Sequence, residues 1–264
     1  MNRVKVELKF LKALFFVNLS SNMEYRFNFI LQVIFMCINN LVYIIFWKLF
    51  FGNFNNINGW NMSDMYLLFS IVTTGFGIGM VVCGNSTQLA NIISMGKLDS
   101  YLILPKNVLL HVLCSRMSIK AVGDVIFGVL IFAVSGVSDV TSIGIWILSI
   151  ICVAIIFVSF TTLFGTLAFW IGKANIIQQQ VNNALLTFAL YPQTIYKGFS
   201  KFIIFTIMPA GIIGFIPVEL IKEFDLTKLL SLIGFCIFIA YISTSIFRLG
   251  LKKYESNNIF TFRD

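Results

Sequence analysis

The sequence predicts an all-α membrane protein with six transmembrane helices. Of its 264 residues, 58% are apolar and 11% are charged, and the mean hydropathy is +0.91. Soluble domains contain about 45–50% apolar and about 25% charged residues. Apolar runs of about 20 residues, the length that spans a bilayer, recur along the chain. The net charge of +8 is scattered between these runs, which excludes the contiguous basic face of a nucleic-acid-binding protein.

The N-terminal residues 1–22 are expected to form an amphipathic helix on the membrane surface. At about 100° per residue, apolar side chains share one face and lysines share the neighbouring face. The apolar face comprises Val4, Leu8, Leu11 and Phe15, and the basic face comprises Lys5, Lys9 and Lys12. Such a pair of stripes suits the interface of an anionic leaflet. The alternative is that this segment extends the first span.

The predicted spans follow from the apolar runs. They are residues 27–51, 65–84, 108–135, 143–171, 174–194 and 229–251. The second contains Gly75 and Gly79, a GxxxG spacing that allows close helix approach, and packing within this chain is the preferred interpretation.

Two assignments of the fifth span are open. Residues 198–222 are apolar but contain Pro209, Gly211, Gly214 and Pro217. A short stretch broken in this way is typical of a re-entrant hairpin, which would follow a span at 174–194. The alternative places the fifth span at 200–216 and makes 172–198 a cytoplasmic amphipathic helix.

Basic residues set the predicted orientation. They gather in the first 26 residues, in the loop at 85–107 and in the tail, whereas the loops at 52–64 and 136–142 contain no Lys or Arg. The positive-inside rule therefore predicts that both termini are cytoplasmic.

Catalytic and metal-binding motifs are missing from the sequence. Nothing fits the phosphate-binding pattern G-x-x-x-x-G-K-[ST], the metalloprotease pattern H-E-x-x-H or the hydrolase pattern G-x-S-x-G. The five cysteines have no metal-ligand spacing, and His111 is the only histidine. The chain is therefore not expected to be an enzyme or to bind a cofactor or metal, and energy for any transport must come from a gradient or a partner.

Two groups of polar residues are candidates for function inside the membrane. Arg116, Lys120 and Asp124 recur every four residues and so share one face of the third predicted span. Lys120 and Asp124 are expected either to form an ion pair along the helix or to form a substrate or proton site. The second group would line a pathway, form a dimer interface or hydrogen-bond between helices. Its members are Gln178, Gln179, Gln180, Asn182 and Asn183.

The loop at 85–107 is longer than a simple connection requires. Leu89, Ile92 and Ile93 have helical apolar spacing, Gly96 interrupts the helix and Pro105 ends it. A short amphipathic helix in a loop is expected to bury its apolar face in a groove of a partner protein or in the membrane surface.

These residues give the chain a resemblance to the type-2 permeases of ABC transporters, in the branch of bacterial six-span exporters. The stretch GKLDSYLILPKN resembles the loop signature G-x-L-D-x-x-L-x-x-P-x-N of that branch. Gly123-Asp124 and the prolines Pro192, Pro209 and Pro217 are similar to recurrent features of the family. The tail at 251–258 resembles the closing pattern G-L-x-x-Y-x-S, although Asn257 replaces the usual small residue.

The resemblance implies a permease that pairs with a second, identical or paralogous, permease and with two copies of a separate ATP-binding subunit. ATP and Mg would be bound by those subunits, and the substrate would be an amphiphile exported across the bacterial plasma membrane. Residues 85–104 would contain the helix that couples to the ATPase. The coupling residues would be Leu89, Ile92, Ile93, Gly96, Leu98 and Asp99. The alternatives are a gradient-driven carrier that uses Asp124 and a non-transporting scaffold or sensor.

Overall fold

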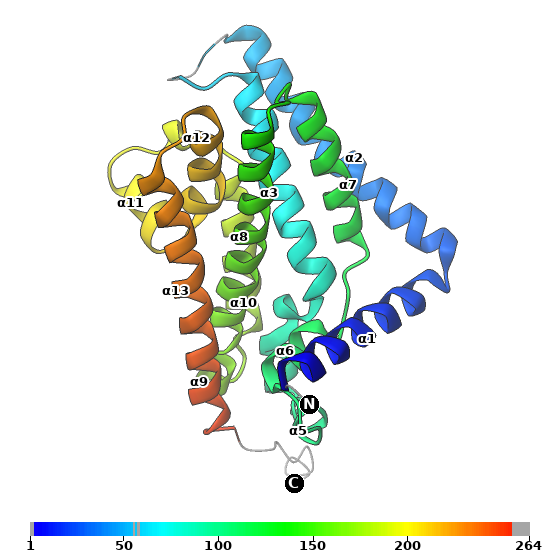
Figure 1. The fold of residues 1–264 in the computed structure, drawn as a ribbon. Helices are drawn as coiled ribbons and strands as arrows, with labels where there is room; N and C mark the ends of the chain where they lie inside the picture. The colour runs from blue at the N-terminus through cyan, green and yellow to red at the C-terminus, as the bar shows by residue number, and fades with distance from the viewer. Residues whose placement is uncertain (1–2, 55, 57–58, 255–264) are drawn as a thin grey trace.

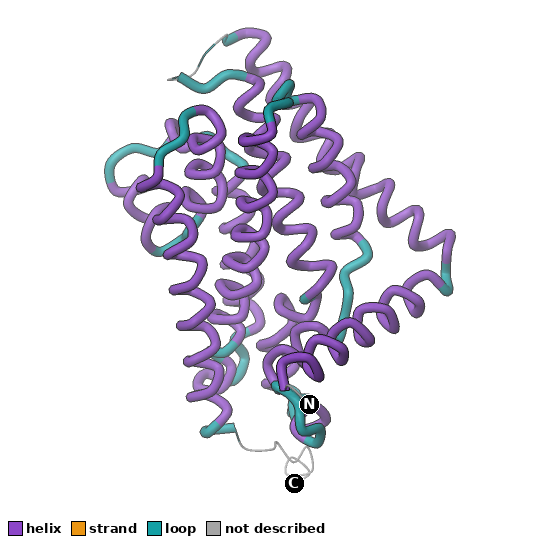
Figure 2. Tube along the Cα trace, in the orientation of Figure 1, coloured by secondary structure: helices purple, strands orange, loops and turns teal. Residues whose placement is uncertain are grey.

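The computed structural model describes residues 3–54, 56 and 59–254, and this part of the chain is helical with no β-strand (Figure 2). The predicted all-α membrane architecture is therefore confirmed. The helices are α1 (Arg3–Met23), α2 (Arg26–Asn53), α3 (Met62–Val82), η1 (Gly84–Gln88), α4 (Leu89–Ser94), α5 (Asp99–Leu102), α6 (Val108–Cys114), α7 (Lys120–Val134), α8 (Val140–Gly165), α9 (Ala168–Ile171), α10 (Asn175–Ala189), η2 (Gln193–Ile195), α11 (Phe199–Thr206), η3 (Gly211–Phe215), α12 (Ile216–Lys222) and α13 (Leu226–Leu251).

Among the described residues, four segments are long and apolar enough to cross a bilayer. They are α2, α3, α8 together with α9, and α13, and a bent pair of shorter helices would make a fifth. Helix length and composition alone do not test the predicted number of six membrane crossings.

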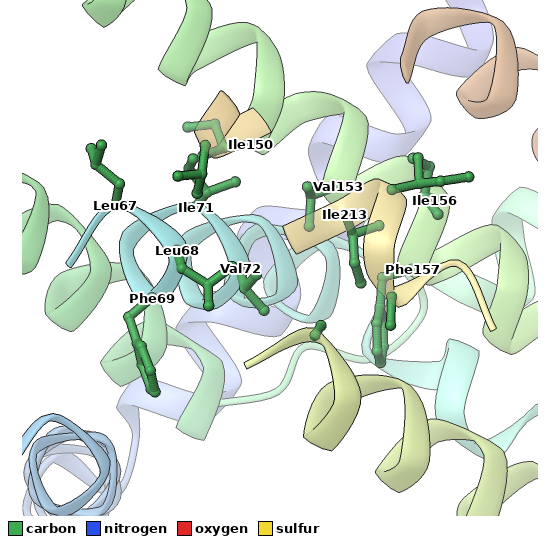
Figure 3. Packing of buried hydrophobic residues seen from close by; sticks show 14 of the residues in the cluster. Leu67, Leu68, Phe69, Ile71, Val72, Ile150, Val153, Ile156, Phe157 and Ile213 are labelled. Atoms are coloured by element: carbon green, nitrogen blue, oxygen red, sulfur yellow. The ribbon is translucent and has the colours of Figure 1, made fainter. Parts of the chain in front are cut away.

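Helix α3 lies at the centre of the bundle (Figure 1). Its residues Phe69 and Ile71 are fully buried, and its side chains pack against Val153 and Phe157 of α8 (Figure 3). A Cβ atom on Gly75 would lie 2.7 Å from the Val153 Cβ. The glycines of α3 therefore allow α8 to approach closely, as predicted for packing within the chain, since van der Waals contact is the main attraction between helices in lipid.

The predicted span at 108–135 is not one helix. Residues 115–119 separate α6 from α7 and are held by backbone hydrogen bonds to the end of α3 and the start of η1. The Ser118 N–H donates to the Met80 carbonyl at 3.1 Å, and the Gly84 N–H donates to the Arg116 carbonyl at 2.9 Å. The unbroken helix was a wrong prediction, because hydropathy does not reveal that the backbone bonds to another segment.

The region 174–222 forms a short helix followed by a bent pair. Helix α10 has 15 residues, or about 22 Å at 1.5 Å per residue, which is shorter than the roughly 30 Å hydrocarbon core. Helix α11 and the segment Gly211–Lys222 then meet at 76°. A bend of this size fits a re-entrant hairpin at 198–222 and also a broken fifth span over 200–216. Both assignments therefore stay predictions.

An ion pair fixes the end of this bent pair to the start of α3. The Lys222 ammonium lies 2.9 Å from Asp64 Oδ2, and it also donates to the Gly59 carbonyl. Asp64 in turn forms a capping box with Asn61 at the N-terminus of α3. The end of α12 therefore lies beside the loop that joins α2 to α3.

Helix α1 is separate from α2 and meets it at a sharp angle (Figure 1). It is attached to the region before and within α6: the Asn107 N–H donates to Glu7 Oε1 at 3.3 Å, and Asn18 Nδ2 donates to the Cys114 carbonyl at 3.0 Å. The alternative that α1 extends the first span is wrong, and its place on the membrane surface stays a prediction.

Candidate functional site

The loop at 85–107, which we call the coupling loop after its predicted role, folds into η1, α4 and α5. Gly96 ends α4 with a positive φ of 70°, a conformation that L side chains rarely adopt. Its N–H donates to the Ile93 carbonyl, and the Lys97 N–H donates to the Ile92 carbonyl at 3.0 Å. This is a Schellman C-cap, which explains physically why a glycine stands at position 96.

The apolar face of α4 packs against this chain itself. Leu89, Ile92 and Ile93 are at most 9% exposed. They form a cluster with α6 residues and with Phe247 of α13, and Leu98 is fully buried in the same cluster. The expectation that this face enters a partner's groove is therefore wrong, because periodicity shows that a face is apolar but not which surface covers it.

The exposed apolar surface of the coupling loop is a different one. We define the loop tip as the exposed apolar side chains at the turn after α4 and at the end of α5: Met95, Leu102, Ile103 and Leu104. Ile103 is 81% exposed, and Lys97 beside them is exposed as well. The sequence signal for the tip was the apolar run at 101–104 outside any predicted span.

One buried side chain joins the coupling loop to the membrane helices. Gln178 of α10 is 1% exposed. Its Oε1 accepts from the Ala90 N–H at 3.1 Å, and its Nε2 donates to the Ser86 carbonyl at 2.7 Å and to the Thr161 carbonyl of α8 at 3.0 Å. Gly165 leaves the room that this amide needs, since a Cβ there would lie 2.6 Å from Nε2.

Asp99, the first residue of α5, lies beside Tyr254, which follows α13. Burial and the neighbouring Asp99 carboxylate together raise the pKa of Tyr254 to about 12. The Tyr254 ring packs edge-on against Phe169 of α9, 6.0 Å between centroids. The start of α5 is thus held against the end of the last long helix. The rest of the tail motif, 255–258, lies outside the described residues.

Helix α10 separates the five predicted polar residues onto two faces. Gln178 and Asn182 are buried, and Asn182 Oδ1 accepts from the Thr161 hydroxyl at 2.8 Å. The other three are exposed and share one face with Thr187. That face, hereafter the polar face of α10, comprises Gln179, Gln180, Asn183 and Thr187. The sequence alone left pathway lining and helix contacts open for all five, and the structure places two of them in helix contacts.

The predicted ion pair between Lys120 and Asp124 is not formed in the described part of the chain. Asp124 is buried, and its Oδ1 accepts from Asn40 Nδ2 of α2 at 2.7 Å. Lys120 is exposed at the first residue of α7, and Arg116 precedes that helix. The prediction was wrong because the buried Asp124 carboxylate is bonded to Asn40 of α2, whereas Lys120 is exposed at the first residue of the same helix. The break at 115–119 separates only Arg116 from this helix.

The described residues contain no group of three or more His, Cys, Asp or Glu side chains that would hold a metal ion. The site has three parts. They are a loop with an exposed apolar tip, the buried Gln178 amide that connects this loop to α8 and α10, and the buried Asp124 carboxylate between α2 and α7.

Comparison with known protein families gives a match over most of the chain. A family model described as an ABC-2 family transporter protein matches residues 37–258, a range that contains the coupling loop, Gln178 and the Asn40–Asp124 pair. Searches of curated proteins and of solved structures found no match.

Proposed function

The chain belongs to the ABC-2 transporter family, and on this premise we propose that it is the permease subunit of an ATP-driven exporter of amphiphiles. Proteins of this family are multi-pass membrane subunits of ABC transporters and are not themselves catalytic. We infer that ATP and Mg are bound by two copies of a separate ATP-binding subunit.

The observation that carries the proposal is the connection through Gln178. A partner that binds the loop tip would displace η1 and α4, and Gln178 bonds both to these elements and to α8. Because each of these bonds is buried, breaking one leaves an unpaired polar group, at a cost of about 1–3 kcal/mol. Displacement of the loop would therefore move α8 and α10 rather than break the bonds.

The polar face of α10 is an argument for contact with a second permease. Exposed amides on a helix inside a bilayer are unfavourable unless another helix or water covers them. A second permease, identical or paralogous, would cover this face, and the substrate pathway would run between the two copies. With the positive-inside rule, both termini lie in the cytoplasm and the coupling loop meets the ATPase there.

The proposal is tested by purifying the tagged chain from native membranes and reconstituting the complex in proteoliposomes. A protein with a Walker A motif should co-elute in stoichiometric amount, and transport should require hydrolysable ATP. The gradient-driven carrier, which the buried Asp124 favours, predicts transport that persists without ATP and stops when the proton gradient is dissipated. A purified complex that hydrolyses ATP but moves no substrate would instead support the scaffold or sensor.

A further inference from the structure

A cavity of about 210 Å³ lies between α2, α3, α7 and α10. We call it the intramembrane pocket, because Asn40 stands near the middle of the apolar helix α2. Its floor contains the buried residues Asn40, Thr73 and Asp124. Its walls include the aromatic side chains Tyr43, Phe76 and Tyr191.

Among the described residues, only one of the two carboxylate oxygens of Asp124 has a hydrogen-bond partner in this pocket. Its Oδ1 accepts from Asn40, whereas Oδ2 is buried and has no hydrogen-bond partner in the described part of the chain. None of the described residues that line the pocket is a lysine or an arginine. A carboxylate inside a membrane is costly unless it is paired, and such residues mark ligand or ion sites.

The aromatic residues at the pocket's opening provide a second feature that attracts cations. Tyr43 is 43% exposed and Tyr191 is 37% exposed, so their rings stand at the opening rather than in the core. Tyrosine rings attract cations through their faces, and the buried carboxylate attracts the same charge from below. Both features select a positively charged group and disfavour an anion.

We propose that the intramembrane pocket binds the cationic head group of an amphiphile, with Asp124 as its counter-ion. This inference rests on the proposed function and specifies its substrate class as amphiphilic amines and quaternary ammonium compounds. The volume supports a head group rather than a whole molecule, because pockets for drug-sized ligands measure about 300–1,000 Å³. The apolar tail then remains outside the opening.

The position of the opening agrees with a transport pathway. Thr187 lines the pocket and also belongs to the polar face of α10. The pocket therefore opens towards the same surface that we assign to the second permease. Thr187, one turn after Asn183, therefore connects the polar face of α10 to the pocket that holds Asp124.

The experiment uses the purified complex of permease and ATPase in nanodiscs, without nucleotide. Binding of dodecyltrimethylammonium is compared with binding of dodecyl sulfate, which has the same alkyl chain and the opposite charge. The cationic probe should bind the wild type more tightly than the anionic probe does. Asp124→Asn, which keeps the shape and removes the charge, should weaken binding of the cation by about tenfold or more. Glu223→Gln, which removes an exposed carboxylate elsewhere, should not change it.

A second variant covers the case in which Asp124→Asn fails to fold. Thr187→Lys places an ammonium group at the opening of the pocket, at a position that is exposed in the single chain. Its binding of the cation is measured in complexes that size-exclusion chromatography shows to have assembled like the wild type. It should abolish binding of the cation, whereas Thr141→Lys, at an exposed position at the start of α8, should not.

Unchanged affinity in a folded Asp124→Asn complex, or in Thr187→Lys, would overturn the inference, and so would equal binding of the two probes. The result is separate from the proposed function, because binding is measured without ATP. If ATP-dependent transport is unchanged in Asp124→Asn, the proposed exporter function is retained and only the assignment of this pocket as a substrate site is rejected.

Discussion

The Ala90 N–H and the Gln178 Oε1 are hydrogen-bonded at 3.1 Å although 88 positions separate them in the sequence. Ala90 is in the first turn of α4, where backbone N–H groups have no partner within the helix. The N-cap residue Gln88 makes no side-chain cap. Gln178 therefore caps the coupling loop's helix from another helix, which ties the conformation of the loop to the position of α10.

Gln178→Leu should destabilise the permease. The change keeps the size of the side chain and leaves the Ala90 N–H and the Ser86 and Thr161 carbonyls without this partner. We expect a loss of about 1–3 kcal/mol for a buried unsatisfied group, measured by thermal unfolding of the purified protein in detergent. The matched control is Gln179→Leu at the neighbouring exposed position, expected to change stability by less than about 0.5 kcal/mol. Equal stability of the two variants would mean that the Gln178 bonds do not hold the loop.

Ile103→Asp should weaken binding of the ATP-binding subunit without unfolding the permease. Ile103 is 81% exposed at the loop tip, so a charge there stays in water in the isolated chain but would be buried in a partner's groove. Truncating or charging a central apolar contact of an interface costs about 2 kcal/mol or more, which is about thirtyfold in affinity. The affinity is measured by titrating the purified ATPase.

The control for this experiment is Val140→Asp, since Val140 is 85% exposed at the start of α8 and away from the coupling loop. It should bind the ATPase as the wild type does. If Ile103→Asp also binds normally, the loop tip is not the docking surface.

The coupling loop shows what the sequence can and cannot predict. The signature glycine, the helix before it and the apolar face were all recognisable, because caps and periodicity are local properties. The structure places Ile93 in the chain's own core, because which surface covers an apolar face depends on residues such as Phe247, far away in the sequence. The partner of Asp124 was missed for the same reason: Lys120 is close in sequence, whereas Asn40 is close in space.

Gly96→Ala should loosen the end of α4. The residue has a φ of 70°, and an L side chain in the left-handed region costs about 1–2 kcal/mol. We expect a loss of stability of that size in thermal unfolding and faster proteolysis between α4 and α5. Gly144→Ala is the control, because this glycine has an ordinary helical φ and open space around its Cβ. A neutral Gly96→Ala would show that the Schellman cap is not required.

The polar face of α10 should contact a second permease in the membrane. A benzophenone maleimide attached to Asn183→Cys is expected to cross-link a permease in native membranes, and mass spectrometry would show whether it is identical or paralogous. The same label on Ile237→Cys, which is 64% exposed on α13, should capture mainly lipid. Equal capture of protein by both positions would contradict the assigned interface.

The coupling loop and the end of α12 should lie on opposite sides of the membrane. Lys222 is bonded to Asp64 and Gly59 beside the loop that joins α2 to α3, and α5 lies at the other end of the bundle (Figure 1). Because the loop at 52–64 contains no Lys or Arg, it is expected to be external. A membrane-impermeant maleimide should therefore label Glu223→Cys in intact cells and Ser100→Cys only after permeabilisation. Both positions are exposed, so lack of label reports sidedness and not burial. The opposite pattern would invert the orientation, and labelling of both in intact cells would show that the two ends do not face different compartments.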